Sequence, residues 1–165
     1  MPMMGYSESL LVYEDEPAPG YLLTLIFLLL PAMLLAAVIY LWSSGESTGG
    51  PVLVAEALFI GLIFWIIFPR SYRVYDDHIR IVLGGPFSIK VGFDRIRKVE
   101  VTSKTSLTVN FVTALARTHV KINKKTGLAI AITPRNQDMF TDHANRALDQ
   151  WARSKRMPEA RISVR

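Results

Sequence analysis

Residues 21–42 (YLLTLIFLLLPAMLLAAVIYLW) and 51–68 (PVLVAEALFIGLIFWIIF) decide the fold of this chain, because together they contain a single charged side chain, Glu56. A helix needs roughly 20 apolar residues to cross the hydrocarbon core of a bilayer, with about 17 as the lower limit. Both stretches meet that length, so the sequence predicts a transmembrane helical hairpin over residues 21–68. Helices of a soluble core rarely run so long without a polar face.

The charges outside the hairpin are unevenly distributed. Residues 1–20 contain no Lys or Arg, which argues against a cleaved signal peptide, since such a peptide begins with basic residues. All 19 Lys and Arg residues lie at or beyond Arg70, and the connection 43–50 (SSGESTGG) has none. With six acidic residues in 1–69 and eight in 70–165, the two parts carry formal charges of −6 and +11.

This asymmetry predicts an orientation. Lys and Arg close to a transmembrane helix stay in the cytoplasm. Because Arg70 and Arg73 follow the second helix directly, that end is expected inside, and two crossings return the N-terminus to the same side. We therefore expect a multi-pass protein of the plasma membrane with an acidic cytoplasmic segment at 1–20 and both termini in the cytoplasm.

Two residues inside the hairpin interrupt its apolar character. Pro31 lacks an amide hydrogen and is expected to bend the first helix. A carboxylate in hydrocarbon costs roughly 3 kcal/mol, which makes Glu56 a candidate for a functional contact. Three interpretations remain open for Glu56: a side chain that reaches the outer interface, a polar contact with a helix of a partner protein, or ion transport, which a single carboxylate makes the weakest.

After the hairpin the hydrophobic pattern changes to a period of two, which is typical of strands with one buried face. Strands are expected at 72–75, 79–83, 87–94, 96–103, 106–113, 118–123 and 128–133. Turns separate them at Asp76–Asp77, Gly84–Gly85–Pro86 and Lys124–Gly127. An apolar stripe that runs from Phe140 to Trp151 then predicts an amphipathic helix over 136–154, followed by a basic tail at 155–165.

Residues 70–152 resemble the bacterial membrane-anchored pleckstrin-homology (PH)-like domains. The resemblance lies in three stretches: YRVYDDHIRIVLGG (72–85), FSIKVGFDRIRKVEV (87–101) and HVKINKKTGLAIAITPRNQDMFTDHANRAL (119–148). It implies a two-pass membrane protein of the α + β class, in which a cytoplasmic PH-like domain over 70–154 follows the hairpin (21–42, 51–68). The expected fold is an antiparallel barrel or sandwich of about seven strands, capped by the C-terminal helix. The resemblance further implies a role in scaffolding or assembly.

The sequence shows no pattern typical of catalysis or of cofactor binding. Eukaryotic PH domains that bind phosphoinositides place several Lys and Arg around the first strand–strand loop, which is Asp76–Asp77–His78 here. The three histidines, at 78, 119 and 143, lack the spacing of metal ligands, and there is no Cys, P-loop, dinucleotide-binding turn or GxSxG motif. We therefore expect a protein that is not an enzyme and has no catalytic, cofactor or metal site.

Basic side chains of the domain are the remaining candidates for a binding surface. Near an anionic inner leaflet each such residue can contribute about 1 kcal/mol, provided that it lies within a Debye length of the surface. A solvated basic face without a ligand is the alternative, and nucleic-acid binding is not expected, since aromatic residues do not interleave the basic ones. The candidates for contact with anionic lipid or a partner are Arg70, Arg73, Arg95, Arg97, Lys98, Lys121, Lys124 and Lys125.

Taken together, the sequence predicts a non-catalytic scaffold or adaptor that mediates protein–protein assembly at the inner face of the plasma membrane. Its expected partners are the lipid bilayer and either another protein or further copies of the chain. Two alternatives remain open. The chain is an accessory subunit of a larger respiratory or transport complex, with Glu56 as an intramembrane contact, or it is a module that senses anionic lipid.

Overall fold

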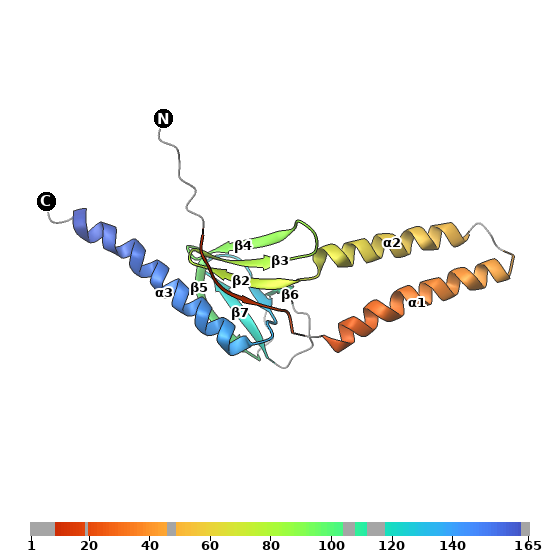
Figure 1. Ribbon diagram of the computed structural model, residues 1–165, viewed down its shortest axis with the longest axis horizontal. Coiled ribbons are helices and arrows are strands. Elements are labelled where there is room, and N and C mark those ends of the chain that lie inside the picture. The colour runs from red at the N-terminus through yellow and green to blue at the C-terminus, as the bar shows by residue number, and fades with distance from the viewer. Residues whose placement is uncertain (1–8, 19, 46–48, 104–107, 112–117, 163–165) are drawn as a thin grey trace, which may run out of the picture.

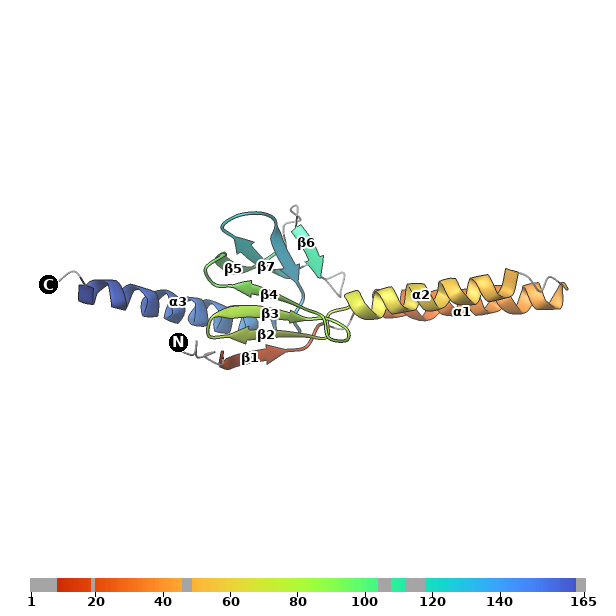
Figure 2. The ribbon, with the colours of Figure 1, turned by 90° about the horizontal axis from the view of Figure 1, so that it is seen from above.

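The computed structural model describes residues 9–18, 20–45, 49–103, 108–111 and 118–162. Two helices, α1 (Tyr21–Ser43) and α2 (Gly49–Ile67), run side by side away from one end of a β-rich body, and α3 (Gln137–Ile162) projects from the opposite end (Figures 1 and 2). The described strands are β1 (Leu11–Asp15), β2 (Ser71–Tyr75), β3 (His78–Val82), β4 (Ser88–Gly92), β5 (Ile96–Thr102), β6 (Thr108–Phe111), β7 (His119–Lys124) and β8 (Ala129–Ile132). We refer to these strands and α3 together as the β domain.

The strands form two four-stranded sheets. The first has the order β1-β2-β3-β4 and is antiparallel throughout. The second has the order β5-β7-β8-β6, in which β6 pairs with β8 in parallel. The expectation of a wholly antiparallel arrangement was therefore wrong at this pair, although the other pairs and the alternating burial of β2, β3 and β7 agree with it.

Strand β1 corrects the expected domain boundary at residue 70. Leu11 pairs with Tyr75 and Asp15 with Tyr72, so part of the acidic segment 1–20 is the edge strand of the first sheet. The hairpin thus lies between two neighbouring strands of one sheet, rather than in front of a separate domain. Asp15 is the buried residue of β1 whereas Leu11 is exposed, which explains why the apolar pattern gave no sign of a strand.

The core of the β domain lies between the two sheets and α3. Its largest side chains that are fully buried are Tyr72, Phe93, Phe140, Ile79, Ile81, Ile96, Ile122 and Ile132. Helix α3 covers this core with Phe140, Ala144 and Ala147, as its apolar stripe predicted. The helix continues to Ile162, however, so the boundary expected at 154 was wrong and residues 155–162 of the expected tail are helical.

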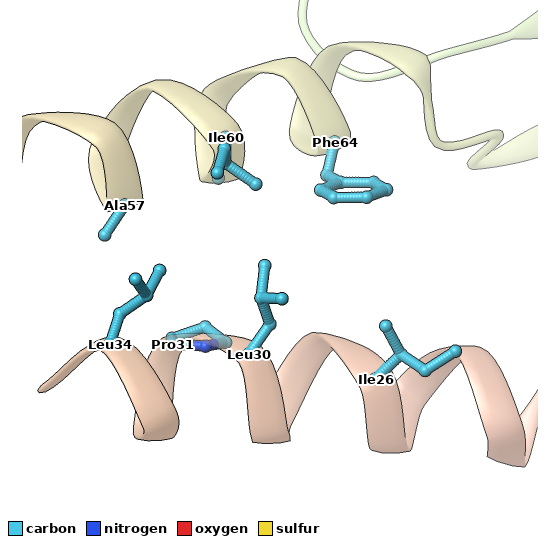
Figure 3. A pocket seen from close by; sticks show the side chains of 8 residues that line it. Ile26, Leu30, Pro31, Leu34, Ala57, Ile60 and Phe64 are labelled. Carbon is cyan, nitrogen blue, oxygen red and sulfur yellow. The ribbon is translucent and has the colours of Figure 1, made fainter. Parts of the chain in front are cut away.

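The two helices of the hairpin face each other with apolar side chains. In Figure 3, Leu30, Pro31 and Leu34 of α1 lie opposite Ala57, Ile60 and Phe64 of α2, around a small cavity of about 40 Å³. Pro31 is accommodated within α1. Most outward-facing apolar residues are exposed, with Leu58 at 70%. Among the described residues, α2 is the helix that is long and apolar enough to span a membrane, and the apolar stretch Leu28–Ser43 is shorter.

Candidate functional site

The end of α2 is held against the β domain through the turn between β3 and β4, and we call this contact the joint. The amide of Gly84 donates a hydrogen bond to the carbonyl of Ile66 at 3.2 Å, and the amide of Arg70 donates one to the carbonyl of Val82 at 2.7 Å. A Cβ atom on Gly84 would lie 1.5 Å from the carbonyl oxygen of Trp65, so this position requires glycine. The sequence marked Gly84 as a turn residue but gave no sign of what the turn contacts.

A groove of about 660 Å³ lies at the joint, where the apolar helices meet the β domain. It is lined by Pro17, Gly61, Phe64, Trp65, Phe68, Pro69 and Arg70. The guanidinium carbon of Arg70 lies 5.3 Å from the centroid of the Trp65 ring, which is the geometry of a cation–π contact. Gly61 and Phe64 also line the cavity between the two helices, so the groove and that cavity meet at these two residues.

On the side of the groove formed by Pro17, β1 and the residues after it fasten the chain to the start of α3. The buried carboxylate of Asp15 accepts a hydrogen bond from the backbone amide of Asn136 at 2.8 Å and one from that of Glu16 at 2.9 Å. Two further backbone hydrogen bonds extend this contact toward the beginning of α1. The amide of Arg135 donates to the carbonyl of Glu16, and the amide of Ala18 donates to the carbonyl of Thr133. A carboxylate at a helix N-terminus satisfies an amide that has no partner within the helix.

Side chains of β1 add contacts to β2 and α3. Nε of Arg73 donates to the carboxylate of Glu14 at 2.9 Å, and this hydrogen bond is the main reason why the pKa of Glu14 lies below its usual value. The ring of Tyr13 stacks on that of His143 with their centroids 4.5 Å apart. Burial, with the charge of Asp15 as a second cause, raises the pKa of Tyr13. Sequence reasoning missed this set because it assigned no strand before the hairpin.

The opposite end of the β domain is rich in charged residues. His78 is buried, pairs with Asp77 and stacks on Tyr75 with the ring centroids 4.5 Å apart. Burial raises the pKa of the Asp77 carboxyl, but the hydrogen bond and charge of His78, together with Lys90, more than offset this and leave the pKa lowered. The first strand–strand loop is therefore held by the contact of Asp77 with His78 and by its ion pair with Lys90.

The structure divides the eight basic candidates between the two ends and the middle of the β domain. Arg70 lies at the joint, and Arg73 in the middle of β2 is paired with Glu14. The backbone bond from Lys125 to Arg95 brings two turns together at the end away from the hairpin. The residues near that end are Arg95, Arg97, Lys98, Lys124 and Lys125, of which Lys98 pairs with Glu100 and Arg95 lies 3.9 Å from Asp94. Lys121 lies further along β7, opposite Glu100.

The remaining candidates stand apart from this surface. Glu56 is an exposed residue of α2, and within the described chain no hydrogen bond or ion pair involves it. His78, His119 and His143 lie on β3, β7 and α3. Among the described residues, no three His, Asp or Glu side chains are grouped so that they could hold a metal ion.

Comparison with known proteins agrees with this architecture. Residues 70–145 match the family model described as a bacterial PH domain. Neither the curated proteins nor the solved structures give a significant match. The matched residues contain β2–β8 and the first turns of α3, and they exclude β1 and the hairpin. From Arg70 to Asn145 the chain is therefore similar to the bacterial PH domain, and it places one further strand and a helical hairpin before that domain.

Proposed function

We propose that the chain is a non-catalytic scaffold of the plasma membrane, in which the hairpin spans the bilayer and the PH-like β domain mediates protein assembly on the cytoplasmic side. The pairing of β1 with β2 carries this proposal, because these two strands flank the hairpin and belong to one sheet. The chain between them must leave and return on the same side of any membrane. The number of crossings is therefore even.

The apolar character of α2 turns this constraint into a two-pass topology. If α2 crosses the bilayer, α1 must cross it as well, and residues 21–42 carry no charge that would oppose this. The β domain follows immediately after α2, and its Arg70 and Arg73 favour the cytoplasmic side. Both termini are then cytoplasmic.

This topology is testable with single cysteines, because the chain has none of its own. Ser44 lies in the described start of the turn between α1 and α2, and Thr126 lies in the exposed turn between β7 and β8. In intact bacterial cells, a membrane-impermeant maleimide should label Ser44→Cys but should label Thr126→Cys only after permeabilisation. Equal labelling of both variants in intact cells would exclude the proposed topology.

The edge of the first sheet that β1 forms supports the assembly role. Strand β1 is an edge strand, and its residues Leu11 and Val12 are exposed, as is Leu10 directly before it. An exposed apolar edge can pair with a strand of another chain. The joint holds this edge in a fixed orientation relative to the hairpin, so partners meet it at a defined distance from the bilayer.

The assembly role is tested by introducing a charge at this edge. Leu11→Lys should lower co-purification of partners, or of a second tagged copy, from native membranes, because a lysine at an edge strand opposes pairing. Leu128→Lys is the matched control, since Leu128 is 46% exposed and Leu11 is 50% exposed. A strictly monomeric protein that retains no partner from its own membranes would contradict the scaffold.

The exposed carboxylate of Glu56 favours a second function, that of an accessory subunit in a larger membrane complex. A carboxylate that faces lipid gains a hydrogen bond when a partner helix covers it. Glu56→Leu should then reduce co-purification several-fold, and Glu56→Gln should reduce it less because it keeps polar atoms. Unchanged assembly of the Leu variant would remove this candidate.

The alternative of a lipid sensor that uses the basic face receives less support. Arg95, Lys124 and Lys125 lie at the end of the β domain opposite the hairpin. A strand of five residues such as β2 spans roughly 16 Å, about twice the Debye length at physiological salt. Attraction between these residues and the bilayer surface is therefore largely screened.

A further inference from the structure

We propose that the groove at the joint binds one anionic phospholipid, with its phosphate at Arg70 and an acyl chain along Phe64 and Gly61. This inference rests on the proposed membrane insertion, which puts the joint at the level of the inner headgroups. It differs from lipid sensing by the basic face, because it concerns a single bound lipid and a different part of the surface.

The position of Arg70 supports the headgroup site. Its backbone amide donates a hydrogen bond to the carbonyl of Val82, and its exposed guanidinium lies over the ring of Trp65. No carboxylate forms an ion pair with Arg70 in the part of the chain that the structure describes. A guanidinium binds phosphate through two parallel hydrogen bonds, so this side chain matches an anion that the protein does not itself supply.

The walls of the groove suit an acyl chain. Apart from Arg70, its lining consists of aromatic rings, prolines and a glycine. A Cβ atom built on Gly61 meets nothing within 4 Å, so open space lies beside α2 at this point. From there the apolar surface continues past Phe64 to the cavity between the two helices (Figure 3).

Charge complementarity favours an anionic phospholipid in the groove over a neutral lipid or an apolar helix of a partner. The groove joins a cation, which has no carboxylate partner among the described residues, to an apolar wall, and an anionic phospholipid has a complementary anion joined to an apolar chain. A zwitterionic lipid such as phosphatidylcholine also offers a phosphate, but its choline cation offsets that charge and weakens the attraction to Arg70. An apolar helix of a partner would use the apolar wall and leave Arg70 without an anion.

Native mass spectrometry of the full-length chain in a mild detergent tests the proposal, with phosphatidylglycerol and phosphatidylcholine of equal chain length as probes. The wild type should bind phosphatidylglycerol about tenfold more tightly than phosphatidylcholine, because the choline cation of phosphatidylcholine offsets the charge of the phosphate that Arg70 binds. Arg70→Gln should lower this preference to about twofold, and Arg70→Lys should retain part of it. Gly61→Leu should weaken both lipids, because the new side chain fills the open space.

Arg97→Gln is the matched control, since it removes one exposed arginine from β5 at the other end of the β domain. It should leave both affinities unchanged. If Arg97→Gln and Arg70→Gln reduce the preference for phosphatidylglycerol equally, lipid binding depends on the net charge of the protein, and the proposed site at Arg70 is wrong. Equal binding of both lipids by the wild type would also overturn the proposal, because the groove would then have no preference for an anionic headgroup.

Failure of the membrane topology can be told apart from failure of this site. Resistance of the chain to extraction from membranes by alkaline carbonate reports insertion of the hairpin, whatever the groove binds. Titration in detergent reports the lipid preference, whatever the topology in the cell. A chain that resists extraction but shows no preference for phosphatidylglycerol contradicts the lipid site alone.

Discussion

The hairpin and the β domain place their apolar side chains in opposite directions. The β domain encloses its apolar residues between two sheets and α3, with Tyr72, Phe93 and Phe140 almost fully buried. The hairpin exposes most of its own along both helices, and Val38 and Gly50 are its buried residues among those described. The same hydrophobic effect therefore stabilises the two regions against different surroundings: the protein interior in one and, in our proposal, lipid in the other.

The largest effect is expected when one large side chain is removed from each region in turn and the two costs in stability are compared. Phe140→Ala should lower the free energy of unfolding in detergent by about 3–5 kcal/mol, because Phe140 is fully buried in the core. Leu58→Ala, at a residue that is 70% exposed, should change it by less than about 0.5 kcal/mol. Urea titration followed by the circular dichroism of the sheets measures both values. A cost for Leu58→Ala similar to that of Phe140→Ala would mean that the hairpin has a protein core of its own.

A substitution at the joint tests how firmly the two regions are connected. Gly84→Ala should cost about 1–3 kcal/mol, since its Cβ atom cannot occupy the space held by the Trp65 carbonyl. It should also increase proteolysis at residues 68–70, where α2 meets β2. Gly61→Ala on the same helix, where a Cβ meets nothing, should change neither value. Unchanged proteolysis in Gly84→Ala would show that the joint does not fix α2 to the β domain.

These tests concern features that the sequence revealed to different degrees. The strands from β2 to β5, β7 and β8 and the core face of α3 follow from alternating or helical apolar patterns, because burial on one face imposes those periods. The turn expected at Lys124–Gly127 is present as well, and Gly127 has a positive φ of 80° there. The local apolar pattern was sufficient to predict strands that pair with their neighbours in the sequence.

Pairings between distant segments could not be read in this way. Strand β1 is short, its one buried residue is Asp15, and its Glu14 meets Arg73 at a separation of 59 positions. The parallel pairing of β6 with β8 likewise depends on the tertiary fold and not on a local sequence pattern. At the candidate site, the sequence identified Arg70 as a charge, whereas the groove beside it depends on how Gly84 approaches Trp65. Such proximities come from the fold rather than from a motif.

A smaller effect is expected where β1 reaches the start of α3. Asp15→Ala should lower the free energy of unfolding by about 1–2 kcal/mol, because the amide of Asn136 loses its buried acceptor. Asp138→Ala in the exposed first turn of α3 should cost less than about 0.5 kcal/mol. Hydrogen exchange at the first amides of α3 separates the two variants, since exchange should accelerate mainly in Asp15→Ala. Equal acceleration in both would mean that Asp15 does not cap the helix.

The smallest effect concerns the exposed pair between β1 and β2. Because the hydrogen bond to Arg73 lowers the pKa of Glu14 in the folded chain, this pair stabilises the fold at neutral pH. That contribution disappears as the pH falls through the lowered pKa. It should amount to about 0.5 kcal/mol or less, since the two side chains are 36% and 38% exposed. Glu14→Gln should therefore reduce, by that amount, the difference in unfolding free energy between pH 7 and pH 3. An unchanged difference would assign no energetic role to the pair.

The interruption of the first sheet by the hairpin also has a consequence for biosynthesis. The ribosome makes β1 before either helix, yet the strand that pairs with it appears only after both helices have been synthesised. Until then β1 has no neighbour in its sheet, and α3, which Asp15 caps, is made last of all. In the topology that we propose, completion of the β domain therefore depends on insertion of both helices in the correct orientation. In the proposed topology, a nascent chain that left β1 on the far side of the bilayer would lack an edge strand and a helix cap, and would expose an incomplete domain.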